Sequence, residues 1–126
     1  DRLGFVEGAH WGESAVGTNA IGTALVSRRA VQIFSAEHFL RSHHAWTCAG
    51  APIRDPRTGH VLGVVDVSGP AATVHPTTIA LVDAVARLAE SHLRTAHLLQ
   101  IAFHEALAVV PPDVTSDMPV ELIFLP

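Results

Sequence analysis

The clearest pattern of apolar and polar positions lies between residues 76 and 104. Charged residues and one histidine recur there at alternating spacings of four and three residues, at Asp83, Arg87, Glu90, Arg94 and His97. Residues three and four apart share one face of a helix, so this pattern predicts a long helix with a solvated stripe, on which each acidic residue pairs with the arginine four positions later. Pro76 suits the first position of this helix, because the N–H that proline lacks has no intrahelical partner there.

The other positions of this helix are apolar around more than one face. One face combines six residues, and three further leucines widen it: Val82, Val85, Ala86, Ala89, Leu93 and Ala96, then Leu81, Leu88 and Leu99. A single sheet covers only one such face, so we expect the helix to pack on a second partner, which we take to be a second copy of the chain in a homodimer. The residues expected at that dimer contact are Leu81, Val85, Leu88 and Leu99.

A β-hairpin is predicted in the middle of the chain. Two apolar runs, TCAGAPIR and HVLGVVDVSG, flank the connection DPRTG, whose Asp, Pro and Gly are typical of turns. In the second run the odd and the even positions are both apolar, so we expect both faces to be covered and helices to lie on each side of the sheet. The preceding run at residues 31–35 predicts another, shorter strand.

The remaining segments give weaker predictions. Residues 1–17 are rich in glycine and have neither helical nor strand periodicity, which predicts a loop. Thr18 or Asn19 is a good N-cap for a short helix that ends at about Ser27. One or two helical turns are expected at residues 36–41 and a loop at 42–45. Three prolines indicate a linker at residues 109–119, and the run VELIFL at 120–125 predicts a final strand that must pair with another segment.

Composition and charge narrow the class of protein. The chain has 126 residues, of which 48% are hydrophobic and 16% charged, as expected of one folded domain. Eight basic against twelve acidic residues give a net charge of −4, which argues against direct nucleic-acid contact by these residues. No run approaches the roughly 20 apolar residues of a membrane span, and the single cysteine cannot form an internal disulfide, so we expect a cytoplasmic protein without membrane contact.

The segment GTNAIGTAL at residues 17–25 permits two interpretations. In the first, Gly17 frees the backbone so that the amides from Thr18 to Ala20 meet an anionic or polar ligand at a helix N-terminus. In the second, Thr18 or Asn19 caps the helix and Gly22 lets its backbone approach the sheet. We favour the second, because the segment lacks the lysine of a phosphate-binding loop and the G-x-G-x-x-G spacing, although both roles can coexist.

Aromatic residues in loop-like settings are candidates for lining a ligand cavity. Trp11, Phe39 and Trp46 have this character, with Asn19 and His38 as polar contacts. The alternative is that the aromatic side chains fill the core at helix ends.

Two residues of the hairpin also have two interpretations. Cys48 is either a small buried hydrophobe or a redox-active thiol, and with one cysteine a catalytic and resolving pair within the chain is impossible. Asp66, between Val65 and Val67, either contacts a ligand or accepts hydrogen bonds that fix the turn into Ser68. We favour the structural role for both residues.

The nine histidines do not form a recognisable metal site. His43 and His44 are adjacent and point apart in any regular element, whereas His38 and His43 are five apart rather than the four that bring two ligands together on a helix. We therefore predict no metal, no other cofactor and no catalytic residue.

Four segments in order resemble one known family: FVEGAHWGESAVGTNAIGTAL, AEHF, HAWTCAGAPIRDPRTGHVLGVVDVSG and HPTTIALVDAVARLAESHL. Over about Leu3 to Leu99 the chain is similar to the GAF sensor domain of bacterial transcription activators of the acetoin-catabolism and dihydroxyacetone type. The resemblance implies an α+β fold, with a six-stranded antiparallel sheet, helices on both faces, a small-molecule pocket and a dimer through long helices. It also implies a DNA-binding segment elsewhere in the parent protein.

The resemblance is incomplete at the amino-terminal side. Such domains normally begin with a helix and two strands before residues like Phe5 to Trp11, so we expect an amino-terminally truncated sheet with an open edge beside the strand at residues 60–68. We assign residues 1–104 to the sensor domain and leave 105–126 as linker and strand without a role. The expected function is sensing of an unknown small-molecule effector together with dimerisation. The alternatives are a ligand-free interaction scaffold or, less favoured, a redox sensor or enzyme based on Cys48.

Overall fold

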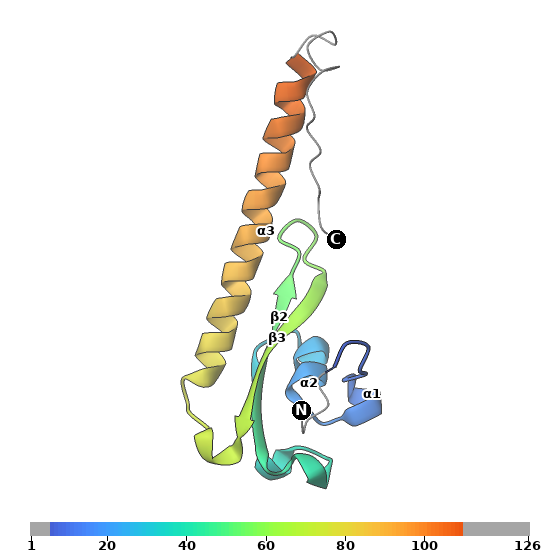
Figure 1. The fold of residues 1–126 in the computed structure, drawn as a ribbon, viewed down its shortest axis with the longest axis vertical. Helices are drawn as coiled ribbons and strands as arrows, with labels where there is room; N and C mark the ends of the chain where they lie inside the picture. Colours follow the sequence, from blue (N-terminus) through green and yellow to red (C-terminus); the bar gives the residue numbers. More distant parts are fainter. Residues whose placement is uncertain (1–5, 110–126) are drawn as a thin grey trace. The chain divides into compact units, whose positions relative to one another are not determined.

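A computed structural model describes residues 6–109, and the chain divides into two units, Asp1–Arg94 and Thr95–Pro126 (Figure 1). The first unit contains an antiparallel sheet of three strands in the order β1, β2, β3, formed by Val31–Phe34, Trp46–Arg54 and Val61–Pro70. The predicted α+β class with an antiparallel sheet is confirmed. The predicted hairpin corresponds to β2 and β3, which pair from Trp46 opposite Pro70 to Arg54 opposite Val61.

The central strand β2 is buried on both faces because side chains alternate along it. Cys48 faces a core that it shares with helix α2 (Ala20–Ser27) and with β1, made of Ala20, Ala24, Val31 and Ile33. Ala49 and Ala51 face the opposite way, onto Val82 and Ala86 of helix α3 (Thr78–Val109). Helices α2 and α3 therefore cover opposite faces of the sheet, as the apolar pattern of the hairpin predicts (Figure 1).

Strand β3 is covered only in part. Val64 packs toward the α2 core and Val65 toward the α3 core, but the flanking Leu62 and Val67 remain exposed. The expectation of two covered faces thus holds for the middle of the strand alone. Within residues 6–109, β2 is the only strand that pairs with β3, so the other edge of β3 is open, as expected.

Helix α2 begins where the sequence predicts. Of the two candidate N-cap residues, Thr18 and Asn19, the structure has Asn19 as the N-cap. Its Oδ1 accepts a hydrogen bond from the backbone N–H of Gly22 at 2.8 Å. The amide Nδ2 donates to the carbonyls of Val16 and Trp11. The loop predicted for residues 1–17 contains, in its described part, a four-residue helix α1 (Glu13–Val16). Its lack of a side-chain cap and of apolar periodicity explains why sequence analysis missed it.

The segment after β1 departs from the prediction of one or two helical turns at residues 36–41 followed by a loop at 42–45. It forms two separate 3₁₀ turns, η1 (Ser35–Glu37) and η2 (Arg41–His43), and a third, η3 (Ala71–Thr73), follows β3. Glu37 accepts a hydrogen bond from the backbone N–H of Phe34, which fixes the first turn. His38 directly follows that turn in an extended conformation, so its side chain leaves the helical path.

Helix α3 starts two residues after Pro76 and extends beyond the predicted end at residue 104. The ion pair of Asp83 with Arg87 is confirmed at 3.1 Å. Glu90 is only 14% exposed and pairs with Arg87 rather than Arg94, so its predicted place on the solvated stripe is wrong. Its other oxygen accepts from the backbone N–H of Arg54, at the irregularity that ends the β2 pairing. The predicted strand at 120–125, and the predicted linker beyond Val109, lie outside the described residues.

Candidate functional site

A polar cluster with two buried and two half-buried residues lies on the sheet face that α2 covers. We call it the His38 cluster, made of His38, Cys48, Asp66 and Ser68. Cys48 lies opposite Ser68, and Gly50 lies opposite Asp66, in the β2–β3 register. Residues two apart on a strand share a face, so this register places Cys48, Asp66 and Ser68 side by side. His38 joins them from the segment after β1, close enough for its charge to act on the Asp66 carboxyl.

The hydrogen bonds at the strand residues have a defined direction. The Ser68 oxygen lies 2.6 Å from Oδ2 of Asp66 and 3.1 Å from Sγ of Cys48. A serine hydroxyl carries one proton, and the shorter contact to the carboxylate is the stronger hydrogen bond, so Ser68 donates to Asp66. Sγ of Cys48 is a second, weaker acceptor for the same Ser68 hydroxyl. Ser68 therefore lies between Cys48 and Asp66 and bonds mainly to the carboxylate.

Two buried atoms of the cluster have no partner in the structure. His38 is 1% exposed, and its Nδ1 lies 3.0 Å from the carbonyl oxygen of Ser35, while Nε2 is buried without a hydrogen bond. Oδ1 of Asp66 is likewise buried and unbonded. A buried polar atom without a hydrogen bond costs on the order of 1–3 kcal/mol, and such atoms are rare in folded proteins. A polar group of a ligand that bonds to these atoms would remove this cost.

Burial shifts the pKa of two side chains in the cluster, Asp66 and Cys48. Desolvation raises the pKa of Asp66 above its usual value, against the hydrogen bond from Ser68 and the charge of His38, which both lower it. Desolvation also raises the pKa of the Cys48 thiol, opposed by the Ser68 hydrogen bond and assisted by the negative charge of Asp66. The thiol therefore stays protonated at neutral pH, whereas the nucleophilic form of cysteine is the thiolate.

Aromatic rings surround His38. The ring of His43 stacks on Trp11 at a centroid distance of 5.7 Å and meets the ring of His38 edge-on at 6.0 Å. Nε2 of His44 lies 3.0 Å from the carbonyl of His38, and because a carbonyl only accepts, this nitrogen is the donor. Burial lowers the pKa of His43, and the charge of His38 lowers it further. These contacts fix both the backbone and the ring of His38.

The structure brings together three of the predicted site residues, His38, Cys48 and Asp66. Trp46 is half-buried and packs against the α2 core beside Cys48. Asn19 is buried but uses its side chain to cap α2, and Thr18 before it is half-buried. Phe39 is separated from them, since its side chain is 78% exposed.

The sequence analysis does not identify two residues of the site, Ser68 and His43. Ser68 lies two positions after Asp66 on one strand and therefore shares its face, but the sequence analysis assigns Ser68 only to the following turn. The stack of His43 on Trp11 joins segments more than thirty residues apart, and no local pattern indicates such a contact.

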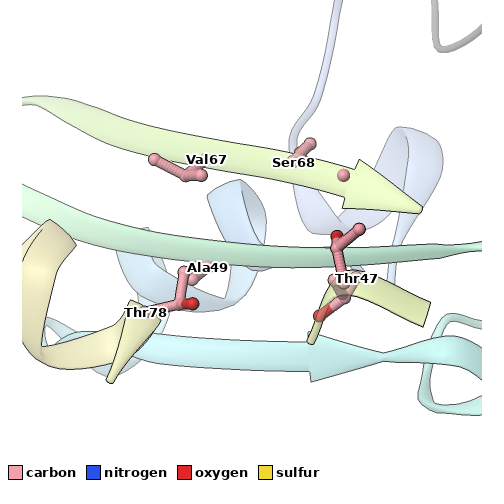
Figure 2. A pocket seen from close by; sticks show the side chains of 7 residues that line it. Thr47, Ala49, Val67, Ser68 and Thr78 are labelled. Atoms are coloured by element: carbon pink, nitrogen blue, oxygen red, sulfur yellow. The ribbon is translucent and has the colours of Figure 1, made fainter. Parts of the chain in front are cut away.

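A small pocket lies on the other face of the sheet. Its volume is about 150 Å³, and its walls come from β2, β3, η3 and the first turn of α3: Thr47, Ala49, Val67, Ser68, Gly69, Thr73 and Thr78. Figure 2 shows Thr47 and Ala49 on β2, with Thr78 at the start of α3. The hydroxyls of Thr47 and Thr73 are already hydrogen-bonded to Gln32 and to the carbonyl of Pro70. Apart from Ser68, no residue of the His38 cluster contributes to this pocket.

Two further features bear on the class of protein. Among residues 6–109, no group of three histidine, cysteine, aspartate or glutamate side chains is arranged to hold a metal ion. The helices in this described part fall short of the combined length and apolar character that a membrane crossing requires.

Comparison with known proteins identifies one domain family and relatives that include a transcriptional regulator. The model of the GAF domain matches residues 1–93. The chain is 50% identical over 97 residues to an uncharacterized 47.3 kDa protein in the thcA 5′ region of Rhodococcus erythropolis, covering 77% of this chain and 22% of that protein. It is 48% identical over 92 residues to the acetoin dehydrogenase operon transcriptional activator AcoR of Bacillus subtilis, covering 73% and 15% respectively. The chain thus spans about a fifth or less of the length of these relatives.

A solved structure gives the same picture for the fold. The chain superposes with a TM-score of 0.79 and 26% identity on a chain of the E. coli DhaR(N)–DhaL complex, covering 85% of this chain and 36% of that one. The structural comparison therefore supports the same fold as the match to the GAF domain family.

Proposed function

Because the chain belongs to the GAF domain family, we propose that it is the effector-sensing and dimerising module of a bacterial transcriptional regulator. In this proposal the module is cytoplasmic and non-catalytic, and residues 1–104 form the sensor domain. The remaining residues lead toward other parts of a longer protein, which carries the DNA-binding function. Its relatives support this role, since AcoR is named as a transcriptional activator.

The observation that carries the sensing function is the pair of unbonded buried atoms in the His38 cluster. A buried polar atom without a hydrogen-bond partner destabilises the free protein, so a ligand that supplies the partner gains the corresponding free energy. The two atoms belong to side chains whose other polar atoms are already bonded to Ser35 and to Ser68. Their orientation is therefore fixed before a ligand arrives, which lowers the entropy lost on binding.

Dimerisation is supported by an exposed apolar stripe on α3. Leu81 and Leu88 are each 57% exposed, and Val85 between them is also exposed. Successive residues of a helix point about 100° apart, so this stripe lies directly beside the buried stripe of Val82 and Ala86 that packs on the sheet. Leu99, in the second unit, is exposed as well. A matching stripe on a second copy would remove these side chains from water.

The proposed mechanism is a coupling between the two sites. An effector in the His38 cluster that binds one dimer arrangement more tightly than another shifts the equilibrium between them. The central strand β2 connects the sites, because Cys48 belongs to the cluster while the adjacent Ala49 packs on α3. A displacement of Cys48 can therefore be transmitted to α3 through the adjacent Ala49 of β2.

The proposal makes no use of Cys48 as a nucleophile. Burial raises the pKa of its thiol, and its Sγ lies 3.1 Å from the Ser68 hydroxyl oxygen. A reactive cysteine needs the opposite surroundings, with a lowered pKa and solvent access. We assign Cys48 to the wall of the effector site.

Native mass spectrometry of the full-length regulator, purified from its own host, tests the sensing function. We expect a bound small molecule in the wild type and much lower occupancy in His38→Gln, which removes the ring that carries the unbonded Nε2. Val26→Ala, on the exposed side of α2, is the matched control and should retain the ligand. Equal occupancy in His38→Gln would place the effector elsewhere, and a wild type without any bound molecule would contradict sensing.

A ligand-free interaction scaffold is the second candidate function. The observation in its favour is that the similar E. coli chain was solved in a complex with a protein, DhaL. A scaffold predicts that a protein partner, and no small molecule, changes the regulator's output. The mass spectrometry experiment separates the two functions, because only the sensor contains a bound small molecule.

A further inference from the structure

We infer that a group of arginines at one end of the sheet is a docking surface for an acidic segment of a partner protein. This group, which we call the arginine patch, consists of Arg28, Arg29, Arg54 and Arg57. It lies where the end of α2 meets the turn between β2 and β3. The patch shares no residue with the His38 cluster, so this inference does not rest on the proposed sensing function.

Hydrogen bonds to backbone carbonyls hold two of these guanidinium groups in place. Nη2 of Arg28 donates to the carbonyl oxygen of Gly59, in the turn of the hairpin, at 3.1 Å. Nη2 of Arg54 donates to the carbonyl oxygen of Arg28 itself. Each contact uses one of the five N–H donors of a guanidinium group. The patch therefore presents further donors in a fixed orientation, which lowers the entropy that a partner loses on binding.

The backbone of Arg28 is a second, independent observation at the patch. Arg28 is the C-cap of α2 and has a φ of 56°, in the left-handed region that favours glycine. Any residue with a Cβ is strained in this region, and strained backbone positions cluster at functional sites. The part of Arg28 that glycine would lack is the side chain that reaches the hairpin turn.

The patch has more positive charge than its surroundings compensate. Arg57 lies 4.0 Å from Asp55, and 65% of its side chain is exposed. The C-terminus of α2 adds the equivalent of about half a negative charge. Glu90 bonds to the backbone N–H of Arg54, but its other oxygen pairs with Arg87. Within residues 6–109, no carboxylate forms an ion pair with the guanidinium groups of the other three arginines. An excess of positive charge therefore remains on a chain whose net charge is −4.

Exposed leucines beside the patch favour a protein partner over a nucleic acid. Leu25 is 41% exposed and precedes Arg28 by three residues, while Leu62 is 59% exposed and follows Val61, the residue opposite Arg54. Arginine together with exposed apolar side chains is typical of protein interfaces. Nucleic acids instead require basic residues that follow many phosphates, and the net negative charge of the chain opposes such binding.

The geometry of the guanidinium group defines the chemistry of the partner segment. Arginine binds a carboxylate through two parallel N–H···O hydrogen bonds. The segment that fits the patch therefore combines glutamate or aspartate side chains with an apolar residue. Opposite charges on the two surfaces also accelerate their association at low salt.

Two matched peptides test this inference on the full chain. The first has the sequence EELEEL, and the second, QQLQQL, has the same shape without the carboxylates. We expect the acidic peptide to bind at least about tenfold more tightly, with a preference that decreases as the salt concentration rises. NMR titration of the ¹⁵N-labelled protein gives both affinities, and the Nε–Hε signals of the arginines report where the peptide binds.

Substitutions within the patch test which arginines bind the peptide. Arg57→Gln removes a charge from an exposed turn, and Arg28→Gly removes another while placing glycine at the left-handed position, so we expect both variants to fold. Each should weaken binding of the acidic peptide about threefold. Arg41→Gln is the matched control, because Arg41 is an exposed arginine in η2, at the opposite end of the sheet (Figure 1). It should leave the affinity unchanged.

The possible outcomes are distinct from those for the sensing function. Equal affinities of the two peptides, or an equal loss of affinity in Arg41→Gln and the patch variants, would overturn the inference. Tighter binding of a DNA duplex than of the acidic peptide at physiological salt, with changes in the same arginine signals, would assign the patch to nucleic acid and also overturn it. Native mass spectrometry of the bound small molecule remains a separate test of sensing, because that ligand is expected in the His38 cluster.

Discussion

Asn19 and Trp11 are joined by a hydrogen bond of 3.1 Å from the Asn19 amide to the Trp11 carbonyl. The same side chain caps α2 through Gly22 and bonds the last residue of α1, Val16. One side chain thus connects the start of α2 with the segment that carries Trp11, whose ring stacks on His43 beside His38. The link explains how a capping residue also positions the surroundings of the candidate effector site.

Replacing Asn19 by alanine tests this link. We expect Asn19→Ala to lower the free energy of unfolding by about 2 kcal/mol, since the cap and two part-buried hydrogen bonds are lost together. Asn19→Asp keeps the acceptor for Gly22 but loses both donors, so its stability should lie between the two. Urea denaturation measures all three proteins. An Asp variant as stable as the wild type would show that the contacts to Trp11 and Val16 contribute nothing.

Gly50 allows α2 to approach the sheet. A Cβ there would meet the Ala20 carbonyl oxygen at 2.9 Å and the Val64 side chain at 3.3 Å, and the Ala20 backbone cannot move away without moving the start of α2 from the sheet. We expect Gly50→Ala to cost about 1–3 kcal/mol of stability, within the range of overpacked sites. Gly63→Ala on β3 is the matched control, because a Cβ there meets nothing within 4 Å. Thermal unfolding that shifts equally in both variants would refute the role of Gly50.

The buried carboxyl of Asp66 predicts a pH dependence of stability. Its folded pKa is raised by burial above the usual 3.8, so between these two values the folded protein binds more protons than the unfolded chain. Stability from this group is therefore fully present below pH 3.8 and is lost as the pH rises through the folded pKa. We expect the wild type to lose stability relative to Asp66→Asn over that rise, in urea denaturation at a series of pH values.

Asp55 provides the control of opposite sign. Its pKa is lowered, chiefly by the hydrogen bond from the backbone N–H of Arg57, so its contribution is present at higher pH and is lost as the pH falls through the folded pKa. The wild type should accordingly lose stability relative to Asp55→Asn on acidification. A pH-independent difference between the wild type and Asp66→Asn would contradict the burial of a titrating carboxyl.

The apolar stripe of α3 predicts the behaviour of the dimer. Leu88→Asp should weaken self-association at least about tenfold, because it places a charge at the proposed centre of the contact. Val26→Asp on α2 is the matched control, since Val26 is an equally apolar exposed residue away from that stripe. Sedimentation equilibrium measures both dissociation constants. A wild type that stays monomeric at all concentrations would exclude the α3 dimer.

The predictable part of the fold rests on local signals. Asn19 before an apolar helix, the turn residues between two apolar runs, and the spacing of Asp83 and Arg87 each act within a few residues. They located α2, the β2–β3 hairpin and the body of α3. Glu90 shows the limit, because its sequence position fits a solvated stripe while its carboxylate binds the end of β2, more than thirty residues away.

The candidate site depended more on the tertiary structure. His38, Cys48 and Asp66 were singled out separately, each by an unusual residue in its local setting, and nothing in the sequence joined them. The strand register places Cys48 opposite Ser68, whose hydroxyl lies within hydrogen-bonding distance of both Cys48 and Asp66. The buried state of Nε2 and Oδ1, which carries the proposal, is a property of that packing alone.

The sequence by itself therefore determined the α+β class, the order of the main elements and the family, because hydrophobic periodicity, caps and turns are encoded over short distances. The tertiary structure decided which polar atoms are left without partners, which faces of β3 and α3 remain exposed, and where Glu90 binds. These properties depend on contacts between segments far apart in the chain, whose geometry is set only when the sheet pairs and the helices pack on it.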